Sequence, residues 1–342
     1  MNVQKGHLGC DMASLIEVAK AAGVSRQTVS NVVNAPDRVR PETRERVEAV
    51  IEELGYQPNA SARNLRRQRS HLIGVDLAPS GPDEVSPVLE RFVHALSEAA
   101  ARVGFHVLIF PRTHDPLTSH VPLHQTRTVD GFVLVDTHHH DPRVATLAEH
   151  RIPFVTFGRT ACDIDHDAVD VDGAAGAGAV AGELARAGCV RPAYVAWPES
   201  SLVGETRLRG FLDGWEAAGH NPGDVAVLRR HNRVEDGVDA VGALAALPGP
   251  FPDAIATVSD LLAVGVLRGL RTHGVTVGED VRLIGFDDAP IAAHLDPPLT
   301  TVRQPLVEVA NRVVTRFLAR LDDPDSPCVT ELLSPELVVR QT

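Results

Sequence analysis

The chain has 342 residues, a net charge of −12 and 44% hydrophobic residues, which leaves room for two or three compact units and excludes a disordered or fibrous protein. No apolar run approaches the roughly 18 to 20 residues of a membrane span, and the N-terminus lacks the apolar stretch of a signal peptide, so we expect a cytoplasmic protein without a membrane partner. The four cysteines have no C-x-x-C spacing, which argues against a zinc site and a disulfide framework.

The charge is divided unevenly along the sequence. Residues 12–71 carry ten Lys and Arg against seven Asp and Glu, a net of +3, whereas residues 72–342 carry −15. A basic head can meet phosphate while an acidic body repels it. The charge pattern therefore leaves nucleic acid open as a partner of the head alone.

Three short helices are the first predicted elements. Apolar residues at helical spacing indicate a helix over about 15–22, and Gly23 ends it. A second helix begins after Ser25, a good N-cap, and a third runs from Pro41 to just before Gly55. Two short helices across a glycine turn, supported by a third, make a helix-turn-helix. The basic segment after them is only about ten residues long and is marginal as an isolated helix, so it reads as a linker that folds only when held.

From Leu72 onward, short apolar strands alternate with amphipathic helices. This alternation predicts parallel, doubly wound sheets, one set over roughly 72–187 and a second over roughly 188–289. Because ligands of such folds bind at the carboxyl ends of the strands, we expect a site in a cleft between two lobes.

Motifs of catalysis and metal binding find little support. The sequence has no G-x-S-x-G elbow and no Walker loop, and the glycines of "DGAAGAG" lie at a helix start, so neither an enzyme nor a cofactor is expected. "DTHHHDPR" and "DIDHDAVDVD" suggest metal sites at first sight, but consecutive side chains at His138, His139 and His140 diverge. We interpret these histidines as residues of a ligand rim or of the surface.

Two ordered groups of motifs carry a family resemblance. "LIEVAKAAGVSRQTVSNVVN" and "VRPETRERVEAVIEELGYQPNASARNLRRQRSHLIGV" resemble the DNA-binding head of LacI/GalR-family regulators. "VDVDGAAGAG", "RLRGFLDGW", "VSDLLAVGVLRGL", "VRLIGFDD" and "DPPLTTVRQP" resemble the effector domain of that family, in the same order. The resemblance covers the chain from about residue 14 to the end.

The resemblance implies a small all-α helix-turn-helix headpiece and an α/β periplasmic-binding-protein-like body of two doubly wound parallel-sheet lobes joined by three crossovers. The expected parts are an N-terminal extension (1–13), the helix-turn-helix domain (14–58), a hinge helix or linker (59–70) and the effector-binding domain (71–342). In the last of these, the N-lobe is expected at about 71–187 and 290–322, and the C-lobe at about 188–289 and 323–342.

In the head, the resemblance places the second helix in the major groove. Base contacts are expected from Arg26, Gln27 and Asn31, of which Asn31 stands where many members have Arg. Phosphate contacts are expected from Thr28, Ser30, Asn34 and Arg40. Arg40 replaces a customary Ser and loses an N-cap interaction of roughly 1 kcal/mol. Leu65 matches the hinge leucine that wedges into the minor groove, and Ala62 would let paired hinges approach closely.

In the body, the resemblance implies an effector site of carboxylates, an arginine and an amide, which suits polyhydroxylated ligands. The expected effector-binding residues are Asp172, Arg207, Asp287, Gln304, Trp197, Phe157, Arg159, Ser259, Asp260 and Asn232. Asp172 and Asp287 could instead cap helices or hold the lobes, and Trp197, the first choice for stacking, could serve in packing alone. Ser259 stands where many relatives have Asn, and Asn232 lies near the position of a stacking aromatic in some of them.

The function implied is a homodimeric repressor that a mono- or oligosaccharide releases from a pseudo-palindromic operator DNA. The dimer is expected because the chain ends at "ELVVRQT", without a leucine-heptad tail. Three alternatives stay open: a corepressor-type regulator that responds to a purine or another metabolite, a sugar-binding protein, and a sugar-modifying enzyme.

Overall fold

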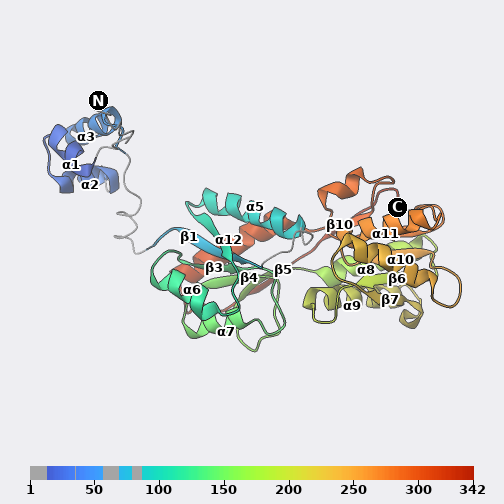
Figure 1. Cartoon of the computed structure of the whole chain (residues 1–342). Helices are drawn as coiled ribbons and strands as arrows, with labels where there is room; N and C mark the ends of the chain where they lie inside the picture. Colours follow the sequence, from blue (N-terminus) through green and yellow to red (C-terminus); the bar gives the residue numbers. More distant parts are fainter. Residues whose placement is uncertain (1–13, 35, 57–68, 79–86) are drawn as a thin grey trace, which may run out of the picture. The chain divides into compact units, whose positions relative to one another are not determined.

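The computed structural model describes residues 14–34, 36–56, 69–78 and 87–342, within two units that span residues 1–70 and 71–342. The first unit contains α1 (Leu15–Ala21), α2 (Arg26–Asn34), the short 3₁₀ helix η1 (Pro36–Arg38) and α3 (Pro41–Glu53) (Figure 1). The side chain of Ser14 caps α1, and Ser25 Oγ accepts a hydrogen bond from the Thr28 amide at the start of α2. Between these helices Gly23 has a φ of 64°, a left-handed conformation that glycine adopts without strain. The three predicted helices and the glycine turn are confirmed.

The first lobe of the second unit contains a six-stranded parallel sheet in the order β11-β5-β4-β3-β1-β2. Its strands are β1 (Leu72–Leu77), β2 (His106–Pro111), β3 (Gly131–Leu134), β4 (Phe154–Phe157), β5 (Asp167–Val171) and β11 (Thr330–Leu333). Its helices are α5 (Pro87–Arg102), α6 (Pro116–Gln125), α7 (Pro142–Glu149) and α12 (Leu306–Asp322). In Figure 1, α5 and α12 cover one face of the sheet and α6 and α7 the other, and each pair forms its own apolar core with the strands.

The second lobe has a four-stranded parallel sheet in the order β7-β6-β8-β9. Its strands are β6 (Pro192–Ala196), β7 (Ala226–Arg229), β8 (Ala254–Thr257) and β9 (Arg282–Ile284). Its helices are α8 (Gly173–Arg186), α9 (Leu202–Ala217), η2 (Pro222–Asp224), α10 (Val234–Ala245), α11 (Asp260–Thr272) and η3 (Pro290–His294). A two-stranded antiparallel pair, β10 (Thr301–Arg303) with β12 (Glu336–Val338), completes the described elements.

Glycines let the second-lobe helices approach closely. A Cβ added at Gly210 of α9 would lie 2.3 Å from the carbonyl oxygen of Ala174 in α8. The same holds for α10 and α11, where a Cβ at Gly265 would lie 2.0 Å from the Val234 carbonyl oxygen. Both contacts are with backbone atoms, which cannot move aside, so these positions exclude a side chain.

The described chain changes from one lobe core to the other at three places, as the resemblance implied. These lie between Val171 and Ala177, between Val302 and Leu306, and between Leu333 and Leu337. Together with the two doubly wound parallel sheets, they confirm the expected fold class.

Some elements lie in the other lobe than the expected boundaries place them. Helix α8 was expected in the N-lobe, but its apolar residues Val180 and Leu184 belong to the core of the second lobe. The segment 323–342 was expected in the C-lobe; its strand β11 instead pairs with β5 at the edge of the first sheet, whereas Leu337 packs against the second core as expected. Part of the segment 290–322 also departs from the N-lobe, because Ala292 and Leu299 pack in the second core. None of the described helices has the length and apolarity needed to cross a membrane.

Candidate functional site

A cavity of about 1140 Å³ lies between the two lobes, at the carboxyl ends of the parallel strands. The first lobe lines it with residues that follow β1, β3 and β4, among them Ala78, Asp136 and Arg159. The second lobe lines it with residues that follow β6 and β9, among them Trp197 and Asp287. This is the place where the doubly wound fold predicts a ligand.

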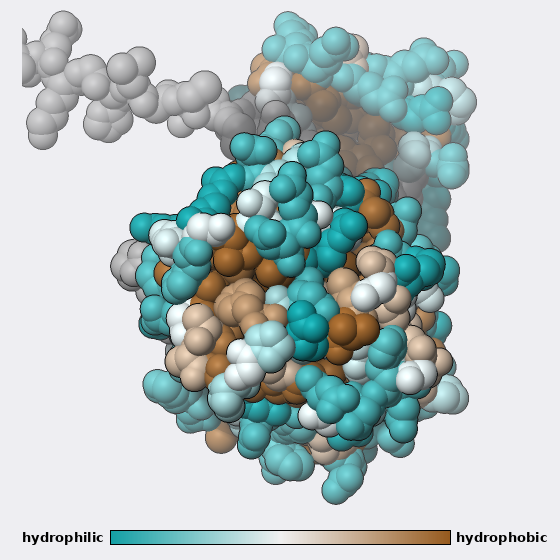
Figure 2. Space-filling view, turned by 90° about the vertical axis from the view of Figure 1, so that its right-hand side faces the viewer, coloured by the Kyte–Doolittle hydropathy of each residue, from teal (hydrophilic) through white to brown (hydrophobic). Residues whose placement is uncertain are grey.

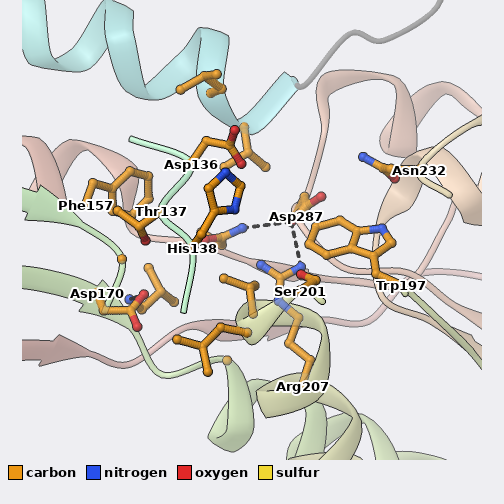
Figure 3. Close-up of a pocket in the computed structure, with 18 of the residues that line it drawn as sticks. Asp136, Thr137, His138, Phe157, Asp170, Trp197, Ser201, Arg207, Asn232 and Asp287 are labelled. Carbon is orange, nitrogen blue, oxygen red and sulfur yellow. Dashed lines mark hydrogen bonds and ion pairs between the residues drawn. The ribbon is translucent and has the colours of Figure 1, made fainter. Parts of the chain in front are cut away.

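A buried polar cluster forms the second-lobe wall. Asp287 Oδ1 accepts a hydrogen bond of 2.7 Å from Gln304 Nε2 and lies 3.3 Å from Arg207 Nη1 (Figure 3). Arg207 comes from α9, Asp287 follows β9 and Gln304 follows β10, so three distant segments meet here. Asp287 has a φ of 121°, a conformation that costs a non-glycine residue energy and that clusters at functional sites.

The guanidinium of Arg207 is fixed by aromatic rings as well as by hydrogen bonds. Its Cζ lies 3.7 Å from the ring centroid of Phe286 and 5.6 Å from that of Trp197. Nη1 donates to the Val258 carbonyl oxygen at 2.7 Å. Arg207 Nε and Trp197 Nε1 are buried and have no hydrogen-bond partner within the described part of the chain. An unsatisfied buried donor is costly, so an acceptor oxygen of a ligand that reached either group would be stabilised there.

Two buried carboxyl groups at this wall, Asp260 and Asp287, have raised pKa values. Burial raises the pKa of Asp260, and the charge of Asp287 raises it further, although Thr301 Oγ1 donates to Asp260 at 2.5 Å. Burial also raises the pKa of Asp287, against the opposing effects of Arg207 and Gln304. The raised pKa values favour the protonated form of these two carboxyl groups, which can donate as well as accept a hydrogen bond.

The first-lobe wall carries a second set of polar groups. Arg159 Nε donates to Asp170 Oδ2 at 2.9 Å, and both residues line the cavity. Phe157 also lines it, with its ring stacked on Phe92 at 4.2 Å between centroids. The sequence did not single out Asp136 and Asp170. The signal was there for Asp136, because it follows directly after the buried run that ends in Val135.

The structure separates the predicted site residues into wall residues and supporting residues. On the cavity wall lie Arg207, Asp287, Gln304, Trp197, Phe157, Arg159, Asp260 and Asn232. Asp172 is not on the wall: its Oδ1 caps α8 by accepting from the Ala175 amide, the capping role left open for it. Ser259 is also off the wall, where it caps α11 and donates to Asn232 Oδ1 at 2.6 Å. Free amides at a helix start attract such side chains, which explains both placements.

Of the three consecutive histidines, only His138 lines the cavity. The backbone carbonyl of His139 accepts from the Ala161 amide instead. Within the ranges that the structure describes, no group of three or more His, Cys, Asp and Glu residues is placed to hold a metal ion.

In the head, the predicted base-contacting residues lie on α2. Arg26 and Gln27 are exposed, and Gln27 Nε2 donates to Asn31 Oδ1 at 2.9 Å, one helical turn away. The hydroxyl of Thr28 is paired with that of Ser25. Arg40 stands at the N-cap of α3 without a side-chain cap hydrogen bond, as its replacement of Ser predicts. The side chain of Asn34, and the whole of Ala62 and Leu65, lie outside the described residues.

Comparisons with known proteins match the two units to separate family models. Residues 14–59 match "Bacterial regulatory proteins, lacI family", and residues 181–342 match "Periplasmic binding protein-like domain". The HTH-type transcriptional regulator CelR of Thermobifida fusca is 33% identical over 333 residues, which cover 95% of this chain and 96% of that protein. The HTH-type transcriptional repressor CytR of Escherichia coli K12 is 30% identical over 96% of this chain and 95% of CytR.

Solved structures agree over almost the same length. The complex of the transcriptional regulator CelR with cellobiose has a TM-score of 0.71 at 30% identity, covering 96% of this chain and 99% of that one. The Lac repressor dimer bound to operator and the anti-inducer ONPF has a TM-score of 0.83 at 26% identity, covering 96% and 98%.

Proposed function

The chain belongs to the LacI family of bacterial regulatory proteins, and we propose that it is a repressor that a sugar-type effector releases from a pseudo-palindromic operator. The relatives named above are DNA-binding transcriptional regulators and not enzymes. The proposed parts follow the expected order, with a head over 14–58, a hinge over 59–70 and an effector-binding body over 71–342.

One observation carries the sugar proposal: the buried cluster of Arg207, Asp287 and Gln304 faces a cavity beside Trp197. A carboxylate accepts from vicinal hydroxyls, and a guanidinium donates to them. An indole offers a flat apolar surface with a polar N–H, which suits the apolar face and hydroxyl rim of a pyranose. The cellobiose complex of the relative CelR supports a sugar of one or more units as the effector.

The link from effector to lobe orientation would run through the residue next to Asp287. Arg91 of the first-lobe helix α5 donates to the Asp288 carbonyl oxygen at 2.8 Å. The Asp288 carboxylate accepts from Arg303 at 2.7 Å and from Arg340 at 2.6 Å, both on segments next to the crossovers. A ligand that moves Asp287 would therefore move groups that join the lobes. Such coupling is typically about 1–3 kcal/mol. Because it is reciprocal, operator binding weakens ligand affinity by the same factor by which the ligand weakens operator affinity.

For operator recognition, Arg26, Gln27 and Asn31 are the proposed base-contacting residues, with Thr28, Ser30, Asn34 and Arg40 at phosphates. The hydrogen bond from Gln27 to Asn31 would fix which face of the Gln27 amide meets a base. Leu65 is the proposed minor-groove wedge, with Ala62 at the close approach of two hinges. Leu65→Ala should bind operator at least about tenfold more weakly while ligand binding is unchanged, because the wedge opens the site for further contacts. Unchanged operator binding in a gel shift would refute the wedge.

A homodimer is the proposed assembly, because two heads are needed for a two-fold symmetric operator. Figure 2 shows apolar patches among hydrophilic side chains on one face of the body. Exposed apolar side chains of the body include Ile291 and Val339, at 50% and 60% exposure. Light scattering at micromolar concentration would measure the mass, and a monomeric mass would contradict the dimer.

The test of the effector class is a thermal-shift screen of the full chain against glucose, cellobiose, maltose and other mono- and oligosaccharides, beside nucleobases and nucleosides. A sugar that raises the melting temperature supports the proposal. A shift with nucleobases and none with sugars would overturn it. A gel shift on DNA selected from random sequences, with and without the active compound, then separates release from the operator from corepression.

A further inference from the structure

A fully buried carboxylate lies beneath the first-lobe wall of the cavity. Asp76, on strand β1 between β3 and the edge strand β2, is 0% exposed. Its Oδ2 accepts from Arg112 Nε at 2.8 Å, its Oδ1 accepts from Arg143 Nη1 at 2.6 Å, and His120 Nε2 lies 3.8 Å away. Burial by itself raises the pKa of Asp76, but His120 and the charges of the two arginines outweigh it and hold the pKa below the ordinary range. Asp76 is therefore an anion that holds two cations inside the lobe.

Both arginines reach beyond Asp76 to the same two residues at the end of β3. Arg143 Nη2 donates to the carbonyl oxygens of Val135 at 3.0 Å and of Asp136 at 3.2 Å. Arg112 Nη2 donates to the Val135 carbonyl oxygen at 2.8 Å, and its Nη1 donates to Asp136 Oδ2 at 3.0 Å. The two guanidinium groups thus connect Asp76 to the backbone and side chain of Asp136, the first cavity-wall residue after β3.

That residue has a backbone conformation that needs support. Asp136 has a φ of 50°, and the left-handed region costs a non-glycine residue about 1–2 kcal/mol. Asp136, Thr137 and His138 follow one another on the cavity wall, so the conformation at Asp136 decides where all three point (Figure 3). The far end of this loop is held by the same network, because Asp141 accepts from Arg143 Nε at 2.9 Å and from the His138 amide at 3.4 Å.

Stability alone does not account for the ion-pair network of Asp76 at this buried position. Well-packed apolar residues in place of a buried ion pair are often neutral or stabilising, because burying charges is costly. The first lobe contains a second buried pair, Asp167 with Arg320 at 2.8 Å, and neither residue lines the cavity. The two pairs differ in what the arginine holds: Arg320 donates to carbonyls of the 323–328 segment, away from the cavity wall, whereas Arg112 and Arg143 hold a wall loop.

We propose that Asp76 is a positioning residue of the effector site: its carboxylate fixes Arg112 and Arg143, which fix the loop 135–138 in the conformation that contacts the ligand. This inference rests on the proposed binding of an effector in the cavity. Asp76 touches no ligand, so its effect on affinity passes through the loop alone.

The test compares Asp76→Asn with Asp167→Asn in the full chain. Asparagine keeps the size of the side chain and removes its charge, and both changes break a buried ion pair. Each variant is titrated by calorimetry with glucose, cellobiose and maltose, and its melting temperature is recorded without ligand. We expect Asp76→Asn to weaken binding at least about tenfold, since the loop loses charged hydrogen-bond support, while Asp167→Asn lowers the melting temperature with affinity unchanged. Equal affinity losses in the two variants, or no loss in Asp76→Asn, would overturn the inference.

A second variant and a ligand-free measurement keep the result decisive. Arg112→Gln removes the outer cation and leaves Asp76 paired with Arg143, so it tests the loop if Asp76→Asn does not fold, and Arg112→Lys should restore part of the affinity. Hydrogen exchange of peptides that cover 135–141 should rise in Asp76→Asn and in Arg112→Gln but not in Asp167→Asn; unchanged exchange would overturn the anchoring role. If the wild type binds none of the three sugars, their assignment as effectors fails, and the exchange result still decides whether Asp76 holds the loop.

Discussion

Replacing Arg207 by lysine tests the proposed effector site most directly. Arg207 is 5% exposed; its Nη1 donates to the Val258 carbonyl oxygen at 2.7 Å, and its guanidinium lies over the Phe286 ring at 3.7 Å. Lysine keeps the positive charge beside Asp287. It lacks the flat guanidinium that stacks on an aromatic ring, and it has one donor nitrogen in place of three. Nε of Arg207, which has no partner among the described residues, is one of the donors that disappear.

The expected loss of sugar affinity follows from the number of ligand hydrogen bonds that the substitution removes. A hydrogen bond to a charged group contributes about 1.5–3 kcal/mol, so the loss of one raises the dissociation constant about 10- to 100-fold. Calorimetric titration of Arg207→Lys with the sugar that stabilises the wild type most would measure this factor. In a gel shift, the sugar concentration for half release should rise by the same factor, while operator affinity without sugar stays unchanged.

Arg209→Lys is the matched control. Arg209 is on the same helix, α9, but is exposed, so the same chemical change should leave sugar affinity within about twofold. If Arg207→Lys binds the sugar as tightly as Arg209→Lys does, the effector does not contact the Arg207 guanidinium, and the assignment of this cluster to the ligand is refuted.

Two further predictions concern stability. Gly210→Ala would place a Cβ 2.3 Å from the Ala174 carbonyl oxygen, so its free energy of unfolding should fall by about 1–3 kcal/mol. Gly182→Ala, with open space around its Cβ, should gain about 0.5–1 kcal/mol; urea denaturation would measure both, and equal effects would contradict the close helix contact. Because the pKa values of Asp260 and Asp287 are raised, the folded state binds more protons than the unfolded state above pH about 4, and stability should fall as pH rises through the raised values. Asp260→Asn should flatten this slope in urea denaturation across pH, and an identical slope would exclude Asp260 as one of its sources.

The sequence by itself determined those features that depend on neighbouring residues. The helix starts at Ser25 and Pro41 and the turn at Gly23 follow from caps and backbone preferences that act within a few positions. The alternation of strands and helices gave the doubly wound class, and the carboxyl ends of the strands gave the place of the cavity. Eight of the ten predicted effector-site residues line that cavity; most of them lie at or just after the end of a strand, whereas Arg207 reaches it from α9.

Only the tertiary structure decided which distant segments meet. Strand β11 joins the first sheet through hydrogen bonds to β5, more than 150 residues earlier, and α8 packs into the second lobe; neither partner is readable from local spacing. Asp172 stays with its own helix as a cap, whereas Arg207 and Asp287 meet across 80 residues of sequence. Asp76 is one acid in a short apolar run, and its role as the centre of an ion-pair network exists only where three elements fold around it. Local signals fix elements because their atoms are already close in the unfolded chain, while sheet edges and buried charges depend on contacts that only the packed molecule makes.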